Sequence, residues 1–310
     1  MSLALFSHPA SHGHHTPPGH PERVQRIEAV EAALADPGFA ALDRREAPAA
    51  TEDLLRLGHP QAYIDRIRAF EPEQGWASLD PDTHMSPGSF QAALHAAGGC
   101  AAAVDAVLGG EAGAAFVAAR PPGHHAEPST PMGFCLFSNA ALAALHALEA
   151  HGLERVAVAD FDVHHGNGTQ AVIERDGRVA FASSQQMPLW PGTGGRDETG
   201  VGNVFNGPLD PGAGGPTFRA LWQQELLPAL DAHAPQLLIV SAGFDAHRDD
   251  PLAQLELDVA DFVWITEALC DLASVHCGGR VVSTLEGGYD LTALAASTAA
   301  HVETLMERAR

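Results

Sequence analysis

The sequence has few basic residues: 17 Lys and Arg stand against 39 Asp and Glu among 310 residues, a formal net charge of −22. Proteins that hold nucleic-acid backbones usually carry clustered basic surfaces, so this balance argues against a nucleic-acid partner and favours a cationic one. The four cysteines show no C-x-x-C spacing. The absence of this spacing argues against a structural zinc knuckle or a disulfide framework, and it favours a reducing compartment.

Signal-like and membrane-like segments are also lacking. The start, MSLALFSHPASHGHH, has neither the basic region nor the long apolar core of a signal peptide. No apolar run approaches the ~20 residues that a membrane span needs. We therefore expect a cytoplasmic protein with no membrane partner. Hydrophobic residues make up 45% of the chain, and no linker, charge block or repeat interrupts it, so we expect a single domain over residues 1–310.

Apolar periodicity alternates along the chain between helices and short strands. Helical spacing predicts helices over 22–36, 89–108, 138–151, 216–232, 258–276 and 291–308. Short runs rich in Val, Ile and Leu predict strands at 114–118, 156–161, 179–183, 237–241 and 281–285. Since these runs are apolar on both faces, we expect a three-layer α/β/α fold with a mainly parallel sheet. The Gly/Pro-rich stretches 71–88 and 191–216 are interpreted as long loops.

A polar cluster follows each strand candidate: ARPPGHHAEP, DVHHGNG, SQQMPLWPGTG, AGFDAHRDDP and EGGYD. In open α/β sheets, ligands bind in the crevice outside the carboxyl ends of the strands. We therefore expect these five loops, although distant in sequence, to converge on one pocket.

The loop after the second strand candidate carries residue types that ligate metals. Asp162 and His164 are two residues apart, so on an extended segment they project to one side together with Asp160, while His165 points the other way. Asp245 would supply a third ligand. Two Asp and one His leave a fourth position open for water, as catalytic zinc sites do. The D-x-H pattern alone is as compatible with a salt-bridged acid pair beside a helix N-cap as with a metal site. Asp245 and the polar residues of the other loops favour the metal site.

Acid–base groups lie in two further loops. His124 and His125 follow a Pro-Pro pair, and an imidazole titrates near neutrality, so one of them can take a proton from water and return it to a leaving amine. Tyr289 follows Gly287-Gly288, and the chain has only two Tyr. Its phenol, together with a metal, would stabilise an oxyanion.

Long stretches of the sequence match a known family. RPPGHHAEP, GFCLFSNAALAA, VADFDVHHGNGTQ, LIVSAGFDAHRDDPL and LEGGYD resemble the histone deacetylase superfamily, especially its class II and bacterial deacetylase-like members. The resemblance runs from HPER at 20–23 to the final helix. It implies an arginase/deacetylase-like sheet of about eight strands, and a zinc-dependent hydrolysis of N-acetyl-lysine in proteins or peptides that releases acetate and a free amine.

The resemblance assigns catalytic roles by position. It implies that zinc, or alternatively iron(II), is held by Asp162, His164 and Asp245. His125 is then the general base and acid, and His124 is a cationic helper that Asp160 holds. The remaining group, Tyr289, polarises the carbonyl.

The resemblance also assigns substrate and potassium sites. Phe134 and Trp190 would flank an acyl-lysine tunnel, and Asp82 would grip the substrate backbone from the rim. The other implied substrate-binding positions are Gly133, Leu252, Gly287 and Gly288. A structural potassium ion is implied at Asp160, Asp162, His164, Ser183 and Ser184.

Two departures from the family pattern bear on chemistry. Asn167 stands where class I members have Asp, and a neutral amide stabilises imidazolium less than a carboxylate does. We therefore expect His125 to rest neutral near pH 7. Trp190 replaces the usual Phe, and its bulk would narrow the tunnel.

Several alternatives remain. An arginase-type hydrolase would need two manganese ions, but Gly166 and His247 stand where its additional acids would be. An acetylpolyamine amidohydrolase would use the same chemistry on small cations; its polyamine-selective eukaryotic relative has Glu at the position of Leu252, so Leu favours acyl-lysine. A catalytically silent acyl-lysine binding module is a further alternative. A metal buffer built on the early histidines is another, although packing at the pocket rim is the preferred role of these residues. The early histidines are His8, His12, His14, His15 and His20. Formation of a homo-oligomer is also left open.

Overall fold

Residues 2–309 are described by the computed structural model, in which strands and helices alternate along the chain. The strands are β1 (Leu3–Ser7), β2 (Asp43–Glu46), β3 (Ala77–Ser78), β4 (His84–Met85), β5 (Ala114–Ala118), β6 (Val156–Asp160), β7 (Val179–Gln186), β8 (Val204–Leu209), β9 (Leu237–Ala242) and β10 (Val281–Leu285).

The helices vary from one turn to five or more turns. They are α1 (Ala10–Gly13), α2 (Gln25–Leu34), α3 (Glu52–Leu55), α4 (Gln61–Phe70), α5 (Ser89–Leu108), α6 (Asn139–His151), α7 (Asn167–Ile173), α8 (Gly215–Leu221), α9 (Leu227–His233), α10 (Val259–His276) and α11 (Leu291–Arg308), with a 3₁₀ turn η1 (Pro37–Phe39) and a π-helical turn η2 (Trp222–Leu226).

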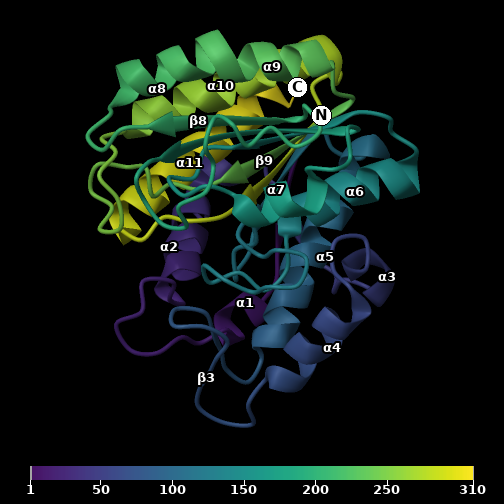
Figure 1. Ribbon diagram of the computed structural model, residues 1–310, viewed down its shortest axis with the longest axis vertical. Coiled ribbons are helices and arrows are strands. Elements are labelled where there is room, and N and C mark those ends of the chain that lie inside the picture. Colours follow the sequence, from purple (N-terminus) through teal and green to yellow (C-terminus); the bar gives the residue numbers. More distant parts are fainter. Residues whose placement is uncertain (1, 310) are drawn as a thin grey trace.

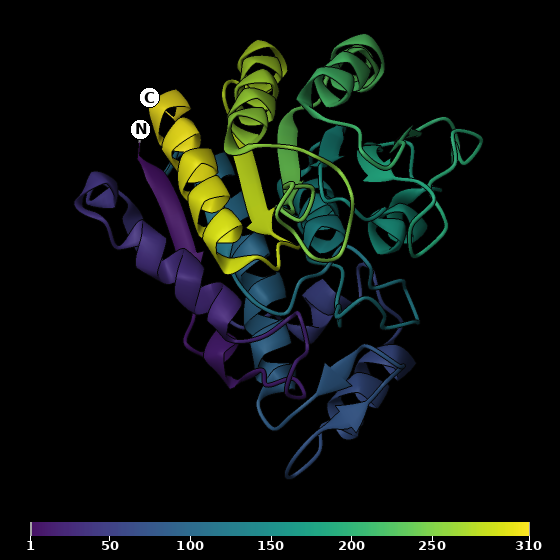
Figure 2. The ribbon, with the colours of Figure 1, turned by 90° about the vertical axis from the view of Figure 1, so that its left-hand side faces the viewer.

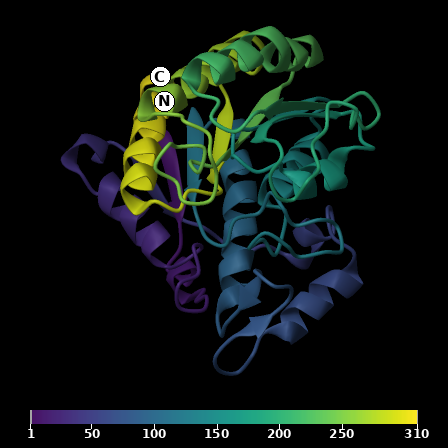
Figure 3. The ribbon, with the colours of Figure 1, turned by 60° about the vertical axis from the view of Figure 1, so that its left-hand side comes forward.

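The described chain forms one eight-stranded parallel sheet in the order β2-β1-β5-β10-β9-β6-β7-β8. Helices α8, α9, α10 and α11 cover one face, and α5 and α6 cover the other (Figure 1). Figures 2 and 3 show the strands between these two helical layers. The short antiparallel pair β3-β4 lies with α4 at the end of the molecule opposite α8 and α9 (Figure 2). The predicted three-layer fold with a parallel sheet is confirmed.

Strand β1 shows how the two faces are buried. Leu3 and Leu5 pack into the core that also contains α2 and α11, whereas Ala4 and Phe6 pack into the core that contains α5 and α6. All four side chains are at most 4% exposed. Since successive residues of a strand point to opposite faces, a strand buried on both sides reads as a continuous apolar run.

Three strands of the sheet were not predicted, namely β1, β2 and β8. The predicted loop over 191–216 is wrong in its middle, because β8 lies inside it. β8 and β2 are the two edge strands, and an edge strand tolerates the Gly207-Pro208 of β8 and the charged DRRE of β2. The predicted loop over 71–88 likewise contains the two short strands β3 and β4.

The predicted helix over 216–232 is present but interrupted. It consists of α8, the π-helical turn η2 and α9. Pro228 lies in the first turn of α9 and has no backbone N–H to continue the ladder of the preceding helix. A local change in helical pitch is the usual response to such a break.

Helix α5 passes through the centre of the molecule beneath the sheet (Figure 3). It is the one helix within residues 2–309 whose length and composition would suit a membrane span, with a mean hydropathy of 1.2 in its most apolar window, so the expectation that no apolar run approaches that length is wrong. In the fold, 67% of that window is buried. Its Ala-rich surface therefore serves as core.

Gly98 explains how α5 packs so closely. A Cβ at this position would lie 2.2 Å from the carbonyl oxygen of Pro48 and 2.5 Å from the backbone nitrogen of Ala50. Glycine costs a helix about 1 kcal/mol relative to alanine. The close approach of the segment before α3 requires it here.

We predict that Gly98→Ala lowers the free energy of unfolding by about 1–3 kcal/mol, because the added methyl group must displace backbone atoms. Urea denaturation followed by circular dichroism measures the change. Gly13→Ala is the matched control, since a Cβ there meets nothing within 4 Å. A Gly98→Ala protein as stable as the unmodified chain would contradict this account of the packing.

Candidate active site

The predicted convergence of loops is observed at the carboxyl edge of the sheet. Strands β5, β10, β9 and β6 lie side by side there. The C-terminal strands β9 and β10 are thus inserted between β5 and β6, which follow each other along the chain. A cavity of about 330 Å³ opens at this edge. It is lined by His20, Pro21, Pro81, Asp82, His125, Gly133, Phe134, His164, Leu189, Trp190, Leu252 and Tyr289.

Three predicted metal ligands lie together beside this cavity. Asp162, His164 and Asp245 bring ligand atoms within 4.8 Å of one another, and all three are buried. His164 Nδ1 lies 3.2 Å from Asp162 Oδ1 and 3.1 Å from Asp245 Oδ2. His165 points elsewhere, as expected, toward Thr193 and Gln170.

The backbone that carries these ligands differs from the expected extended segment. Strand β6 ends at Asp160, and residues 162–164 form a bend. Asp160 Oδ1 accepts from the N–H of Asp162, and Asp162 Oδ1 accepts from the N–H of His164. Each carboxylate thus fixes the backbone two residues further on. The side chains converge because of these bonds rather than because of strand alternation.

The residues present fit a zinc-type ion. Two carboxylate oxygens and one imidazole nitrogen are a donor set of catalytic zinc sites. Glycines keep the space around the acids open: a Cβ at Gly243 would lie 1.9 Å from Asp162 Oδ2, and one at Gly287 would lie 2.1 Å from Asp245 Oδ2. Burial and the charge of Asp162 raise the pKa of Asp245. Two adjacent buried acids are stabilised by a cation between them.

The tandem histidines have different partners. His124 Nδ1 lies 3.0 Å from Asp160 Oδ2, and His125 Nδ1 lies 2.8 Å from Asn167 Oδ1. Burial lowers the pKa of His124, but the charges of Asp162 and Asp160 outweigh it and raise that pKa well above its usual value. Burial and the neighbouring charge of His124 lower the pKa of His125 well below its usual value. The two adjacent imidazoles therefore differ in charge.

Aromatic rings form the walls of the cavity. The Phe134 ring lies edge to face with Tyr289 at 5.8 Å between centroids, and the Trp190 ring lies 4.7 Å from that of His125. Trp190 is 40% exposed, so it lies at the mouth. Gly133 has a φ of +56°, and a Cβ there would lie 2.4 Å from His125 Cδ2. Only glycine fits between these rings.

Tyr289 is held deep in the cavity. Its side chain is 7% exposed, and burial raises the pKa of its phenol well above the usual value, so the hydroxyl keeps its proton. The N–H of Tyr289 donates to Asp250 Oδ2 at 2.7 Å. Asp250 follows β9, and this bond ties the loop after β10 to the neighbouring loop.

Three of the residues predicted for potassium lie on neighbouring strands, namely Asp160 on β6 and Ser183 and Ser184 on β7. Asp160 pairs with Ser183 across β6 and β7. The Ser183 hydroxyl donates to Gln185 Oε1, and Ser184 Oγ accepts from Trp222 Nε1 at 3.0 Å. All five of these residues are at most 2% exposed. The potassium assignment stays a prediction.

Sequence reasoning missed Glu286, which fixes the loop of the tandem histidines. It is fully buried, and its Oε2 accepts from the N–H groups of Gly123 at 2.7 Å and His124 at 3.1 Å. Its Oε1 accepts from the hydroxyl of Ser241. The only available signal was its place between a buried strand and Gly287-Gly288.

A buried ion-pair network behind Tyr289 was also missed. Arg26 of α2 donates from Nε to the carbonyl oxygen of Gly288 at 2.6 Å, and its guanidinium lies 4.9 Å from the centre of the Tyr289 ring. Glu22 accepts from both Arg26 and Arg120. All three charged residues are fully buried. In the sequence Glu22 and Arg26 resemble ordinary surface charges at the start of a helix, and Arg120 resembles an ordinary loop residue after a strand.

The early histidines have separate roles. His14 is buried against Ser89 Oγ, His12 faces Glu31, and His8 stacks on His95. Within residues 2–309, none of the five early histidines belongs to a group of three or more metal-ligating side chains. His20 lines the cavity and lies 2.9 Å from the carbonyl oxygen of Asp82. The structure gives no support to a metal buffer in this segment.

The second manganese site of an arginase-type hydrolase also lacks its ligands. Gly166 packs against Asp160, where a Cβ would lie 2.3 Å from Asp160 Oδ2. His247 accepts from the N–H of Asp249 through Nδ1 and lies outside the metal-ligand cluster. A single metal at Asp162, His164 and Asp245 is the arrangement that these residues fit.

Comparison with known proteins identifies the family. A model of the histone deacetylase domain matches residues 20–305. The chain therefore belongs to the histone deacetylase family, whose members include amidohydrolases and deacetylases.

Individual relatives agree with this assignment. A "histone deacetylase-like amidohydrolase" of Pseudomonas aeruginosa is 43% identical over 278 residues, which cover 87% of this chain and 73% of the relative. A "probable deacetylase" of Archaeoglobus fulgidus is 38% identical, covering 94% of this chain and 82% of its own. The crystal structure of the HDA15 HD domain superimposes with a TM-score of 0.94 at 34% identity, over 99% of this chain and 89% of that one. The predicted deacetylase-like fold is confirmed.

Proposed function

We propose that this protein is a metal-dependent deacetylase that hydrolyses N-acetyl-lysine in proteins or peptides to acetate and a free amine. The observation that carries the proposal is the meeting of His164, His125 and Tyr289 in one cavity, with Asp162 and Asp245 directly beneath. A metal ligand, an acid–base group and a hydroxyl donor are the groups that amide hydrolysis requires. Family membership supports hydrolase chemistry.

Asp162, His164 and Asp245 would hold the metal. When bound, zinc, or alternatively iron(II), supplies Lewis-acid polarisation of the acyl oxygen and lowers the pKa of water. A potassium ion near Asp160 and Ser183 would have a structural role. The substrate amide would lie between the ligand cluster and the aromatic walls.

His125 is the general base and acid. Asn167 Nδ2 donates to Glu127 Oε1 at 3.0 Å, which orients the amide so that Asn167 Oδ1 faces His125 Nδ1. Since that oxygen can only accept, Nδ1 of His125 carries its proton and Nε2 is the free base. Nε2 takes a proton from water and returns it to the leaving amine.

His124 and Tyr289 stabilise charge. The cationic form of His124, which Asp160 and Asp162 favour, adds a positive field beside the reacting carbonyl. The protonated hydroxyl of Tyr289 donates to the oxygen that becomes negative in the transition state. Gly287 and Gly288 place this tyrosine in the cavity.

The cavity suits a substrate with an acylated aliphatic amine. Phe134 and Trp190 would contact its methylene groups, Leu252 would contact its apolar stem, and Asp82 at the rim would accept from its backbone. The net charge of −22 favours approach of cationic peptides. The alternative substrate, an acetylated polyamine, is compatible with the same groups. A silent binding module would not need His125 and Tyr289 placed as they are.

We predict that His125→Ala and Tyr289→Phe each lower kcat by at least about 100-fold, because each removes a proton-transfer or oxyanion-stabilising group. Both variants should keep the tightly held metal, since neither residue is a ligand. Asp245→Ala should lose it. Deacetylation of an acetyl-lysine peptide and metal analysis of dialysed protein measure these outcomes. His233→Ala, at a partly exposed position of α9 that does not line the cavity, is the control. Full activity in His125→Ala would overturn the mechanism.

We predict that a carboxylate in place of Asn167 moves the acidic limb of the kcat/KM profile to higher pH. A base must be neutral to accept a proton, so activity falls as the pH drops through the pKa of His125. Asp at position 167 would stabilise the imidazolium and raise that pKa by about one unit or more.

The variant must account for Glu127, which lies beside Asn167. Asn167→Asp is therefore combined with Glu127→Gln, which removes repulsion between two carboxylates, and Glu127→Gln alone is the matched control. An acidic limb that does not move between the two proteins contradicts the role of Asn167. A wild-type limb above about pH 8, against an ordinary His pKa of ~6.5, contradicts a neutral resting His125.

We predict that the protein prefers acetyl-lysine peptides to acetylputrescine, and that Leu252→Glu reverses or weakens this preference by about tenfold or more. The new carboxylate would face the second ammonium group of a polyamine. With an acetyl-lysine peptide, the same carboxylate would lose water against the apolar side chain of the lysine without gaining a partner, which would weaken binding. Parallel kcat/KM measurements on both substrates test this. Leu252→Met, which keeps an apolar side chain, is the control. Higher kcat/KM for acetylputrescine in the unmodified protein would favour the polyamine alternative.

A further inference from the structure

A second cluster of metal-ligating side chains lies outside the active site. Asp105 of α5 and His146 and His151 of α6 bring ligand atoms within 4.8 Å of one another. Within residues 2–309, this cluster and the one at Asp162, His164 and Asp245 are the two groups of three such residues. None of the three residues lies in a loop that carries the catalytic groups, since Asp105 is in α5 and both histidines are in α6.

The geometry of the cluster brings two imidazoles to one carboxylate oxygen. His146 Nε2 and His151 Nε2 each lie 2.7 Å from Asp105 Oδ1. The other oxygen, Oδ2, makes no hydrogen bond within the described part of the chain, and the imidazole rings are 5.6 Å apart at 80°. Both Nε2 atoms therefore already face a common point.

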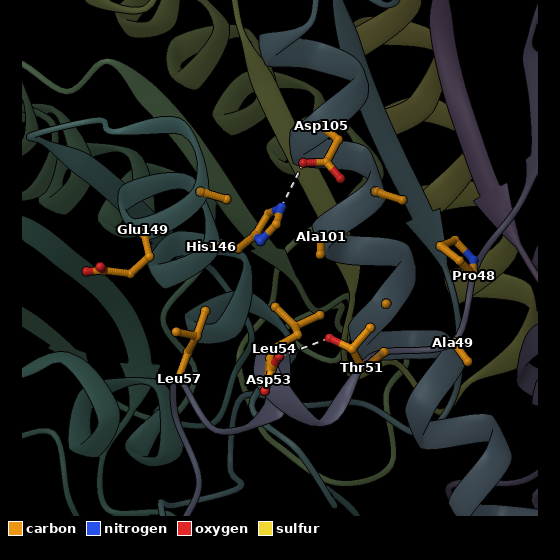
Figure 4. Close-up of a pocket in the computed structure, with 14 residues that line it drawn as sticks. Pro48, Ala49, Thr51, Asp53, Leu54, Leu57, Ala101, Asp105, His146 and Glu149 are labelled. Carbon is orange, nitrogen blue, oxygen red and sulfur yellow. Dashed lines mark hydrogen bonds and ion pairs between the residues drawn. The ribbon is translucent and has the colours of Figure 1, made fainter.

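The cluster is accessible to a metal ion. The side chains of Asp105, His146 and His151 are 56%, 20% and 27% exposed. Asp105 and His146 border a cavity of about 490 Å³ between α3, α5 and α6, and Figure 4 shows His146 pointing toward Asp105 at its edge. Glu149 borders the same cavity, and its negative charge favours a cation nearby.

We propose that Asp105, His146 and His151 form a second site for a divalent ion of the zinc and nickel class. Imidazole nitrogens suit these metals, and a carboxylate completes a three-residue set. Water from the cavity supplies the remaining ligands. The site is distinct from the active site and does not depend on the proposed deacetylase activity.

An ordinary ion pair explains this arrangement less well. At Asp231 the chain has a single histidine partner, His276, whose Nε2 lies at the same distance of 2.7 Å. One imidazole is enough for that interaction. At Asp105 two imidazoles converge on one carboxylate oxygen, so this cluster offers one ligand more than the pair at Asp231. A bound metal takes the place of both Nε2 protons, so both rings can be neutral.

A metal here would join two helices. His151 is the last residue of α6, and Gly152 follows in a left-handed conformation that ends the helix. Asp105 lies in the last turn of α5. An ion that binds only the folded arrangement raises the melting temperature, and above Kd the stabilisation grows with the logarithm of its concentration. This gives the site a readout apart from catalysis.

The test titrates Ni²⁺ or Zn²⁺ into holoenzyme that already contains its tightly held metal, by isothermal titration calorimetry. We expect one further equivalent per chain. His151→Gln and Asp105→Asn should each weaken its binding by at least about tenfold, because loss of a ligand costs at least as much as loss of a supporting contact. His276→Gln is the matched control and should leave the binding unchanged.

Three further measurements separate binding from misfolding. The melting temperature of the holoenzyme should rise with added Ni²⁺ in the unmodified protein and in His276→Gln, and should stay constant in His146→Gln and His151→Gln. Circular dichroism and deacetylase activity without added metal should be unchanged in these variants, because neither residue lines the active-site cavity. Absence of a further equivalent, or a further equivalent with the same affinity in Asp105→Asn, would overturn the proposal.

Discussion

The structure depends on the burial of carboxylates at the carboxyl ends of its central strands. Asp160, Asp162, Asp245 and Glu286 are at most 1% exposed, and a buried charge is tolerated only where polar partners surround it. Backbone N–H groups supply many of these partners: Val163 donates to Asp245, Gly287 to Asp162, and Gly123 to Glu286. The acids thus determine the paths of the loops that carry the ligands, the tandem histidines and Tyr289.

The same acids differentiate two adjacent histidines. His124 contacts a carboxylate, Asp160, whereas His125 contacts the neutral amide of Asn167. Burial lowers the pKa of both imidazoles. At His124 the charges of Asp162 and Asp160 outweigh it, whereas at His125 the charge of His124 adds to it. An electrostatic helper and a base can then occupy neighbouring positions. The charge on His124 in turn disfavours a proton on His125, which couples the two roles.

Much of this arrangement could be predicted from the sequence, and the exceptions have physical causes. Continuous apolar runs identified β5, β6, β7, β9 and β10, because strands buried on both faces lose the alternation that marks a half-exposed strand. The edge strands β2 and β8 lack such runs: β2 consists of charged residues, and β8 contains Asn206, Gly207 and Pro208. Glu286 was missed because its partners are backbone N–H groups, which leave no trace in residue types.

The position of Tyr289 illustrates why local patterns cannot specify the whole site. Arg26 lies 262 residues from Gly288, yet it donates to that carbonyl oxygen and places its guanidinium over the Tyr289 ring. A buried Arg requires a buried acid, which Glu22 provides, and Glu22 also accepts from Arg120 beside the tandem histidines. Removal of one partner would leave an uncompensated charge in the core. The tyrosine loop and the histidine loop are therefore held by a single ion-pair network, and the start of α2 is as much a part of the active site as the loops that line it.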